Sequence, residues 1–170
     1  IISLYLSQIL PSMENMVYLL SAVIFLAILI PFVFYLFTLQ RTLEAIAIES
    51  RKMAPGHVWF LFIPFFNIVW QFMMTARIAD SIRDECIRLQ IPLSESRPTF
   101  ALGLVMTILY IVSIPINNVS AAPMLGVLFS LAALVCWIVY WVKVNNYRKL
   151  IIANRDNFLL DIEKETASLQ

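Results

Sequence analysis

Charged residues are missing from long parts of this chain. Hydrophobic residues make up 61% of its 170 positions and charged residues only 14%. A soluble domain has about 45–50% apolar and about 25% charged residues. Long uncharged runs rich in Leu, Ile, Val and Phe are typical of segments that lie in lipid. The sequence therefore predicts an all-α integral membrane protein. The uncharged runs cover residues 1–13, 15–40, 53–76 and 98–142.

Glycine, cysteine and histidine are also scarce. Three glycines argue against a glycine-rich loop that cradles phosphate. Cys86 falls in a charged stretch and Cys136 in an apolar one, so we expect no disulfide. The single histidine, His57, is a candidate ligand for a haem or pigment. Alternatively, His57 is an ordinary side chain at the membrane interface, beside the Pro55-Gly56 turn.

Hydropathy and turn residues divide the chain into membrane and surface segments. We expect one membrane domain over residues 1–170. Each predicted span approaches or exceeds the roughly 30 Å of a hydrocarbon core at about 1.5 Å per residue. In chain order the expected segments are an interfacial segment (1–11), a transmembrane helix (16–40), an amphipathic helix (41–54), a proline-broken segment (57–76), a cytoplasmic helical extension (77–91), two further transmembrane helices (98–116 and 123–142) and a cytoplasmic tail (143–170).

The proline-broken segment decides the topology. Pro64 and Asn67 interrupt it, so it either re-enters on the side from which it came or forms a kinked fourth span. In the re-entrant alternative all twelve Lys and Arg residues face one side, whereas in the spanning alternative three face the other nine. The positive-inside rule favours re-entry, with the N-terminus outside and the C-terminus in the cytoplasm. The objection is that bent backbone at membrane depth needs cover from protein.

Two groups of residues are candidates for contacts with lipids or partner proteins. In the broken segment, Asn67 and Gln71 could bind a headgroup or the backbone of a partner, or could satisfy carbonyl groups that Pro64 leaves unpaired. On the last span, small residues recur every fourth position, a pattern that lets helices approach closely, either within this chain or with a partner. The candidates are Trp59, Pro64, Asn67, Trp70 and Gln71 from the first group, and Ala122, Gly126 and Ser130 from the second.

The charged stretch after residue 76 predicts an amphipathic helix. An apolar stripe at helical spacing is expected to pack on another helix or on the bilayer surface. Asp80 and Asp84 lie among arginines, so a surface of salt bridges is a better interpretation than a metal site. The stripe consists of Ile78, Ile82, Cys86 and Leu89, and the opposite side carries Asp80, Arg83, Asp84 and Arg88.

Other chemistry is weakly represented. No ionisable side chain falls inside a predicted span, which argues against an ion-coupled transporter. The serines of the spans have no histidine partner for nucleophilic catalysis. The net charge of +1 gives no general attraction to nucleic acid. We therefore expect a protein that is not an enzyme, with no catalytic residue, metal or cofactor and no nucleic-acid partner.

Three sequence blocks resemble a signature of small bacterial integral membrane proteins whose activity is uncharacterised. That signature is approximately Arg-x-Met-x-Pro-Gly-x-Val-Trp, then Ile-Pro-x-Phe-Asn-x-Val-Trp-x-Phe, then Ala-x-Ser. The resemblance implies a bacterial inner-membrane location, transfers no catalytic residue, and suggests that the element from Pro64 to Trp70 is functional. The blocks here are residues 50–59 (SRKMAPGHVW), residues 63–72 (IPFFNIVWQF), and Ala79-Asp80-Ser81 with Glu85.

These observations lead to one functional expectation and two alternatives. We expect a non-enzymatic accessory or scaffold subunit of a bacterial inner-membrane complex, in contact with membrane lipids and with other membrane proteins or further copies of itself. The first alternative is a conduit for lipid or small solutes with Asn67 at the tip of the broken segment. The second is a pigment- or haem-associated subunit that uses His57.

Overall fold

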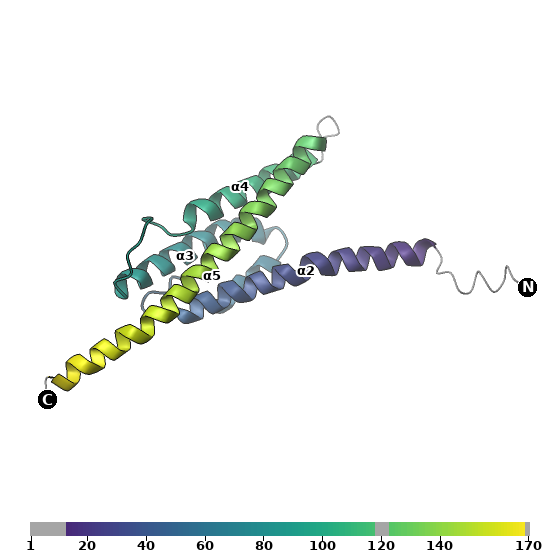
Figure 1. Ribbon diagram of the computed structural model, residues 1–170. Helices are drawn as coiled ribbons and strands as arrows, with labels where there is room; N and C mark the ends of the chain where they lie inside the picture. Colours follow the sequence, from purple (N-terminus) through teal and green to yellow (C-terminus); the bar gives the residue numbers. More distant parts are fainter. Residues whose placement is uncertain (1–12, 118–122, 169–170) are drawn as a thin grey trace, which may run out of the picture. The chain divides into compact units, whose positions relative to one another are not determined.

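The computed structural model describes residues 13–117 and 123–168 (Figure 1). The described residues form helices and turns, without a strand, so the predicted all-α class is confirmed. The predicted interfacial segment, residues 1–11, lies outside them. The elements are α2 (Met13–Ala45), the 3-10 helix η1 (Pro55–Phe62), α3 (Phe66–Arg88), α4 (Phe100–Asn117) and α5 (Pro123–Ser168).

Two helices of the described chain are long and apolar enough to cross a membrane. They lie at Asn15–Ala45 within α2 and at Met124–Leu160 within α5, and they contain two of the predicted spans. A shorter apolar helix, Phe100–Ile116 within α4, coincides with the third. At about 1.5 Å per residue, its 17 residues reach about 26 Å. The crossing by α4 stays a prediction.

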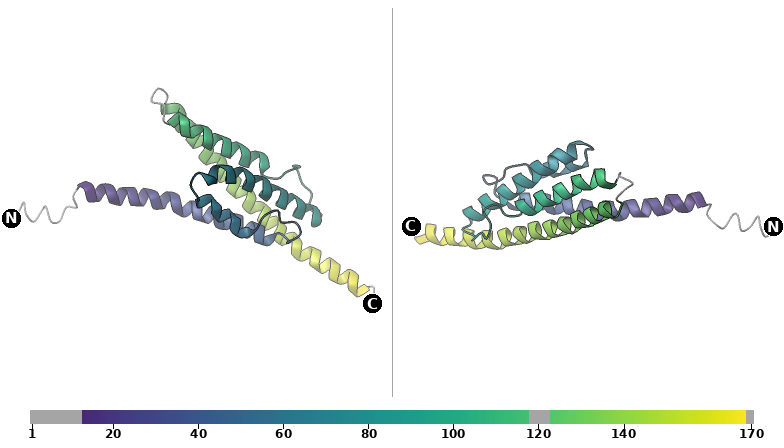
Figure 2. Two further views of the ribbon diagram at one scale, coloured as in Figure 1. Left: turned by 180° about the vertical axis from the view of Figure 1, so that it is seen from behind. Right: turned by 90° about the horizontal axis from the view of Figure 1, so that it is seen from above.

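The chain divides into two compact units, residues 1–35 and 36–170. The described part of the first is the N-terminal portion of α2, which continues through Pro31 without ending. In the second unit α4 packs along α5, and α3 packs against η1, α4 and α5 (Figure 2). The core of this unit is built from the side chains of Leu36, Leu39, Leu43, Ile46, Val58, Met74, Ile78, Ile82, Val144 and Ile151, all fully buried or nearly so.

The apolar stripe of α3 is buried in this core. Ile78, Ile82 and Cys86 are fully buried and Leu89 is nearly so. Since α3 packs on other helices of the same chain, the prediction that this stripe packs against a helix is confirmed. The predicted helical extension over residues 77–91 continues α3, which runs without interruption from Phe66 to Arg88.

The amphipathic helix predicted over residues 41–54 is wrong. Residues 41–45 are the last turn of α2, and turns occupy residues 46–54. Arg51 folds back on the end of α2: its Nε donates to the carbonyl of Ile46 at 3.0 Å and its Nη2 to that of Glu44 at 3.2 Å. Its guanidinium thus satisfies carbonyl groups that the end of α2 leaves unpaired, and the helix ends there.

The proline-broken segment reverses direction. Residues 63–65 form a turn between η1 and α3, and Phe65 has a positive φ of 63°. His57 contacts Trp70, while Phe60 contacts Phe66, so η1 lies antiparallel to the first turns of α3. Residues 55–76 are called the aromatic hairpin below. The predicted interruption at Pro64 therefore coincides with this turn.

Candidate functional site

Aromatic side chains join the two arms of the aromatic hairpin. The indole Nε1 of Trp70 donates a hydrogen bond to the carbonyl oxygen of His57 at 2.9 Å. The Phe60 ring lies against the same indole, with ring centroids 5.3 Å apart. Trp70 is almost completely buried. This residue, predicted to contact a partner or lipid, therefore also holds η1 against α3.

Trp59 joins the hairpin to the end of α2. Its Nε1 donates to Oε1 of Gln40 at 2.7 Å, and the amide of Gln40 donates in turn to Oε1 of Glu44 at 2.8 Å. Phe37 meets the Trp59 ring edge-on at 5.1 Å. The indole hydrogen bonds of Trp70 and Trp59 thus connect η1 to α3 and to the end of α2.

The tip of the hairpin consists of Phe62, Ile63, Pro64, Phe65 and Phe66. All five side chains are exposed, and Phe65 is 90% exposed. The turn provides several of its own hydrogen bonds: the backbone N–H of Ile63 donates to Phe60 at 3.1 Å, that of Phe66 to Pro64 at 2.7 Å, and that of Asn67 to Ile63 at 3.0 Å. Pro64 has no N–H to satisfy. The tip is therefore apolar in its side chains and internally bonded at these amides.

Asn67 and Gln71 lie in the first turns of α3, four residues apart and so on one side of that helix. Both are half-buried. Asn67 follows the tip and is not its most exposed residue, a position that belongs to Phe65. The structure therefore places these two predicted contact residues beside the hairpin turn, behind its aromatic tip.

His57 is half-buried and contacts two aromatic rings. It stacks on Phe60 with centroids 5.2 Å apart and meets Trp70 edge-on at 6.1 Å. Its Nδ1 is buried and makes no hydrogen bond within the described chain. Across residues 13–117 and 123–168, no three His, Cys, Asp or Glu side chains are grouped as metal ligands. Haem or pigment binding by His57 stays a prediction.

The open end of the hairpin carries ion pairs. Nζ of Lys52, before η1, lies 2.6 Å from Oδ2 of Asp84, near the end of α3. The backbone N–H of Lys52 donates to the hydroxyl of Ser81 at 2.9 Å. Asp84 is also held by Arg83 at 3.0 Å. The hydrogen bond from Lys52 is the main cause of a lowered pKa of Asp84, against the effect of its partial burial.

Two more ion pairs connect α3 with the segment before α4. Arg97 binds Asp80 with both nitrogens of its fork, at 2.9 and 2.7 Å, and its guanidinium lies 4.2 Å from the centroid of the Phe100 ring. The bond to Asp80 raises the pKa of Arg97. Lys143 of α5 contacts Glu95 at 2.6 Å. The polar end of the second unit is therefore connected across three segments.

Glu85 is the buried member of this group, with no exposed side-chain surface. Nε and Nη2 of Arg88 bind its two oxygens at 3.0 and 2.5 Å. Burial raises the pKa of Glu85, but hydrogen bonds from Arg88 and Ser50 and a backbone N–H bond from Ala47 outweigh it, so the net pKa is lowered. Arg88 also lies over the ring of Phe158 in α5, 5.6 Å from its centroid.

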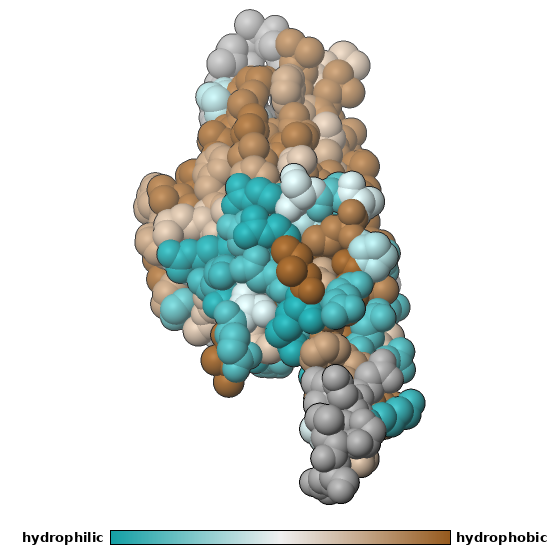
Figure 3. Space-filling view, turned by 90° about the vertical axis from the view of Figure 1, so that its left-hand side faces the viewer, coloured by the Kyte–Doolittle hydropathy of each residue, from teal (hydrophilic) through white to brown (hydrophobic). Residues whose placement is uncertain are grey.

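These charged residues are called the ion-pair layer below. Figure 3 looks toward the end of the molecule where α3 ends and shows hydrophilic side chains gathered there, with hydrophobic side chains beyond. The predicted salt-bridge surface is present. Sequence reasoning placed Arg83 beside the two aspartates but missed Lys52 and Arg97, which come from other parts of the chain. The layer consists of Lys52, Asp80, Arg83, Asp84, Glu85, Arg88, Glu95, Arg97 and Lys143.

The small residues of α5 occupy less exposed positions. Gly126 is buried and Ser130 is half-buried, on a helix that packs along α4. Ala122, the first of the predicted series, lies outside the described residues. Sequence reasoning missed a closer approach at Gly103 of α4, where a Cβ would overlap the methyl of Thr75 and lie 2.8 Å from the Tyr140 ring. No spacing pattern marks Gly103, because its neighbours come from other helices.

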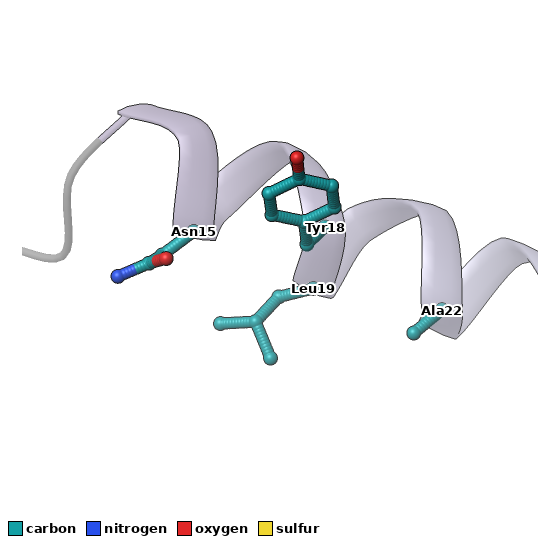
Figure 4. Close-up of a pocket in the computed structure, with 4 residues that line it drawn as sticks. All are labelled: Asn15, Tyr18, Leu19 and Ala22. Atoms are coloured by element: carbon teal, nitrogen blue, oxygen red, sulfur yellow. The ribbon is translucent and has the colours of Figure 1, made fainter.

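A shallow pocket on α2 is lined by one helix alone. Its lining residues, Asn15, Tyr18, Leu19 and Ala22, come from consecutive turns (Figure 4). A ligand site normally encloses most of its ligand with groups from several elements. The side chains around the aromatic hairpin, which come from α2, η1 and α3, are the better candidate site.

The residues that carry the sequence resemblance contact one another. Ser50 bonds Glu85, Lys52 bonds Ser81, and Trp70 bonds the His57 carbonyl. Together they form the hairpin and part of the ion-pair layer. No protein-family model, no curated protein and no solved structure matches the chain.

Proposed function

We propose that this chain is a multi-pass protein of the bacterial inner membrane and serves as a non-enzymatic accessory or scaffold subunit of a membrane complex. The observation that carries this proposal is the length of α5. It is one helix of 46 residues, which at about 1.5 Å per residue extends about 69 Å. This is more than twice the roughly 30 Å of a hydrocarbon core.

The last turns of α5 are an arm beyond the ion-pair layer. Lys143 binds Glu95 of that layer, and Arg88 lies over the ring of Phe158, so α5 stays against the second unit as far as Phe158. From there to Ser168 the helix continues for about 15 Å. Leu159 and Leu160 on this arm are 57% and 53% exposed. Exposed apolar side chains on a polar helix are typical of a surface that another protein covers.

The topology that we propose has crossings by α2, α4 and α5 and a re-entrant aromatic hairpin. The Lys52–Asp84 contact supports it, because it holds both ends of the hairpin at one level. The packing of α4 along α5 supports it as well, because two spans joined by a short connection run in opposite directions. The Lys and Arg excess then faces the cytoplasm, with the N-terminus outside.

Purification in mild detergent tests the proposed function. Tagged full-length chain is expected to recover at least one other membrane protein or further copies of itself. The variant Leu159→Glu/Leu160→Glu is expected to lose that protein while it stays in the membrane fraction after carbonate extraction. Asn146→Glu/Asn157→Glu adds the same two charges at exposed positions of α5 and serves as the control. A full-length chain recovered as a monomer, with no second protein, contradicts the proposal.

A further inference from the structure

The tip of the aromatic hairpin is fixed by its own chain and left uncovered by it. Phe62, Ile63, Phe65 and Phe66 expose apolar surface, and Phe65 is the most exposed of them. Phe65 also has a φ of 63°, which an aromatic residue rarely adopts. Exposed aromatic surface is unfavourable in water, and an apolar surrounding accounts for the exposure of these side chains.

We infer that this tip inserts directly among the acyl chains of one membrane leaflet, without cover from another protein. The inference rests on the proposed membrane location and names what the hairpin contacts there. Irregular backbone is ordinarily excluded from lipid because its polar groups find no partner. Here the N–H groups of Ile63, Phe66 and Asn67 donate within the turn, and Pro64 carries none. At these four positions no N–H group is therefore left without a partner.

The length of each arm of the hairpin matches the thickness of one leaflet. The eight residues of η1 rise about 16 Å at about 2.0 Å per residue. On the other arm, the uncharged part of α3 from Phe66 to Ala76 rises about 16 Å. Half of a hydrocarbon core is about 15 Å. With the ion-pair layer among the headgroups, the tip reaches the middle of the bilayer and stops there.

The charges of the hairpin agree with this orientation. Residues 53–76 contain no charged side chain, whereas Lys52, Arg77 and Asp80 lie at its open end. The indole N–H groups of Trp59 and Trp70 are already bonded to Gln40 and to the His57 carbonyl, so burial in lipid leaves neither of them unpaired. The part of the hairpin that would contact acyl chains therefore carries apolar side chains and indole N–H groups that are already hydrogen-bonded.

Spin labels on full-length protein in vesicles of phosphatidylethanolamine and phosphatidylglycerol test this inference. A label is attached at Phe65→Cys and, as a matched control, at Gln90→Cys. Gln90 is also exposed and also has a positive φ, 56°, but lies at the polar end of α3. We expect oxygen to reach the label at position 65 several-fold more readily than a water-soluble nickel chelate does, and the opposite order at position 90.

Two outcomes overturn the inference. If neither oxygen nor the nickel chelate reaches the label at position 65, another part of a protein covers the tip. If the nickel chelate reaches the label more readily than oxygen does, the tip lies in water. A label at Phe62→Cys, on the other arm of the tip, repeats the measurement should Phe65→Cys not fold. Failure of the accessory-subunit proposal has a separate readout, because it is judged by the proteins recovered with the chain.

Discussion

Lys52 and Asp84 hold the aromatic hairpin closed across its open end. Nζ of Lys52 lies 2.6 Å from Oδ2 of Asp84, and the two residues come from opposite sides of the chain reversal at residues 63–65. The side chains are 43% and 25% exposed, so solvent screens the pair. The pair therefore contributes little to the free energy of unfolding. Its structural effect is to hold the two ends of the hairpin at one level.

The first prediction is a small but measurable coupling between these two residues. Lys52→Met, Asp84→Asn and the double variant form a cycle in which each single change removes the pair. We expect a coupling free energy of about 0.5–1 kcal/mol, because the pair is partly exposed. Thermal unfolding in detergent measures it. Arg155 and Asp156 lie 3.8 Å apart, and the Asp156 side chain is 69% exposed, so they serve as a control pair with coupling near zero. Equal coupling in both pairs contradicts a structural role for Lys52 and Asp84.

The second prediction concerns the side of the membrane on which the two ends of the hairpin lie. Lys52→Cys and Arg83→Cys are expected to react with a membrane-impermeant maleimide from the same side, the cytoplasmic one. The native Cys86 and Cys136 are replaced by alanine for this measurement. Labelling of spheroplasts and of inverted vesicles gives the comparison. Reaction of positions 52 and 83 from opposite sides eliminates the re-entrant topology.

The third prediction concerns the buried carboxylate of Glu85. Glu85→Gln is expected to lower the free energy of unfolding at neutral pH by about 3 kcal/mol, the low end for breaking a buried pair, because Arg88 is 34% exposed. The pKa of Glu85 is lowered from its ordinary value of 4.5. Its stabilising contribution is therefore present above that value and is lost as the pH falls through the lower, folded-state pKa.

Unfolding by denaturant at neutral pH and in acid checks this prediction. The difference between wild type and Glu85→Gln should shrink as the pH is lowered further below 4.5. Glu44→Gln is the control, since this carboxylate is exposed at the end of α2 and accepts a bond from the Gln40 amide. A difference for Glu85→Gln that is independent of pH contradicts the assignment of a charged, buried Glu85.

The spacing of apolar residues and the position of a proline made part of this structure predictable. The stripe of Ile78, Ile82 and Cys86 follows the helical repeat, so its burial could be expected before any contact was known. Pro64 marked the break in residues 57–76, because proline lacks an N–H and interrupts a helix. Such local signals act within a few residues of where they are observed.

The remaining features depend on partners from distant parts of the chain. Arg51 bonds the carbonyl groups of Glu44 and Ile46 where α2 ends, although the sequence predicted a second helix over residues 41–54. Glu85 is buried because Ser50 and Arg88 satisfy it, and nothing near it in sequence indicates Ser50 as a partner. These contacts arise from packing, which overrides local propensity.

The fourth prediction concerns the thiol of Cys86. Its side chain is fully buried, and burial, with a smaller effect of the Glu85 charge, raises the pKa of Cys86 to about 11. At pH 7 about one molecule in 10⁴ then carries the reactive thiolate at this position. We expect alkylation of Cys86 to be slow in the folded protein and rapid after denaturation. Mass spectrometry of peptides after timed iodoacetamide treatment measures both rates, and fast labelling of folded protein contradicts the buried position.

The fifth prediction concerns Gly103, where α4 passes closest to its neighbours. A Cβ added there would overlap the Thr75 methyl and approach the Tyr140 ring to 2.8 Å. Gly103→Ala is expected to destabilise the protein by about 1–3 kcal/mol through overpacking. Gly56→Ala is the matched control, because a Cβ at Gly56 meets nothing within 4 Å. Thermal unfolding in detergent compares the two variants.

A second-site change separates overpacking at Gly103 from a general effect of alanine. Thr75→Ser removes the methyl that the new Cβ would meet and keeps the hydroxyl that lies, buried, with those of Thr99 and Tyr140. The Tyr140 ring stays in place, so Thr75→Ser should restore only part of the stability that Gly103→Ala loses. Additive effects of the two substitutions would show that Thr75 and Gly103 are not in contact, since neighbouring sites couple and separate sites do not.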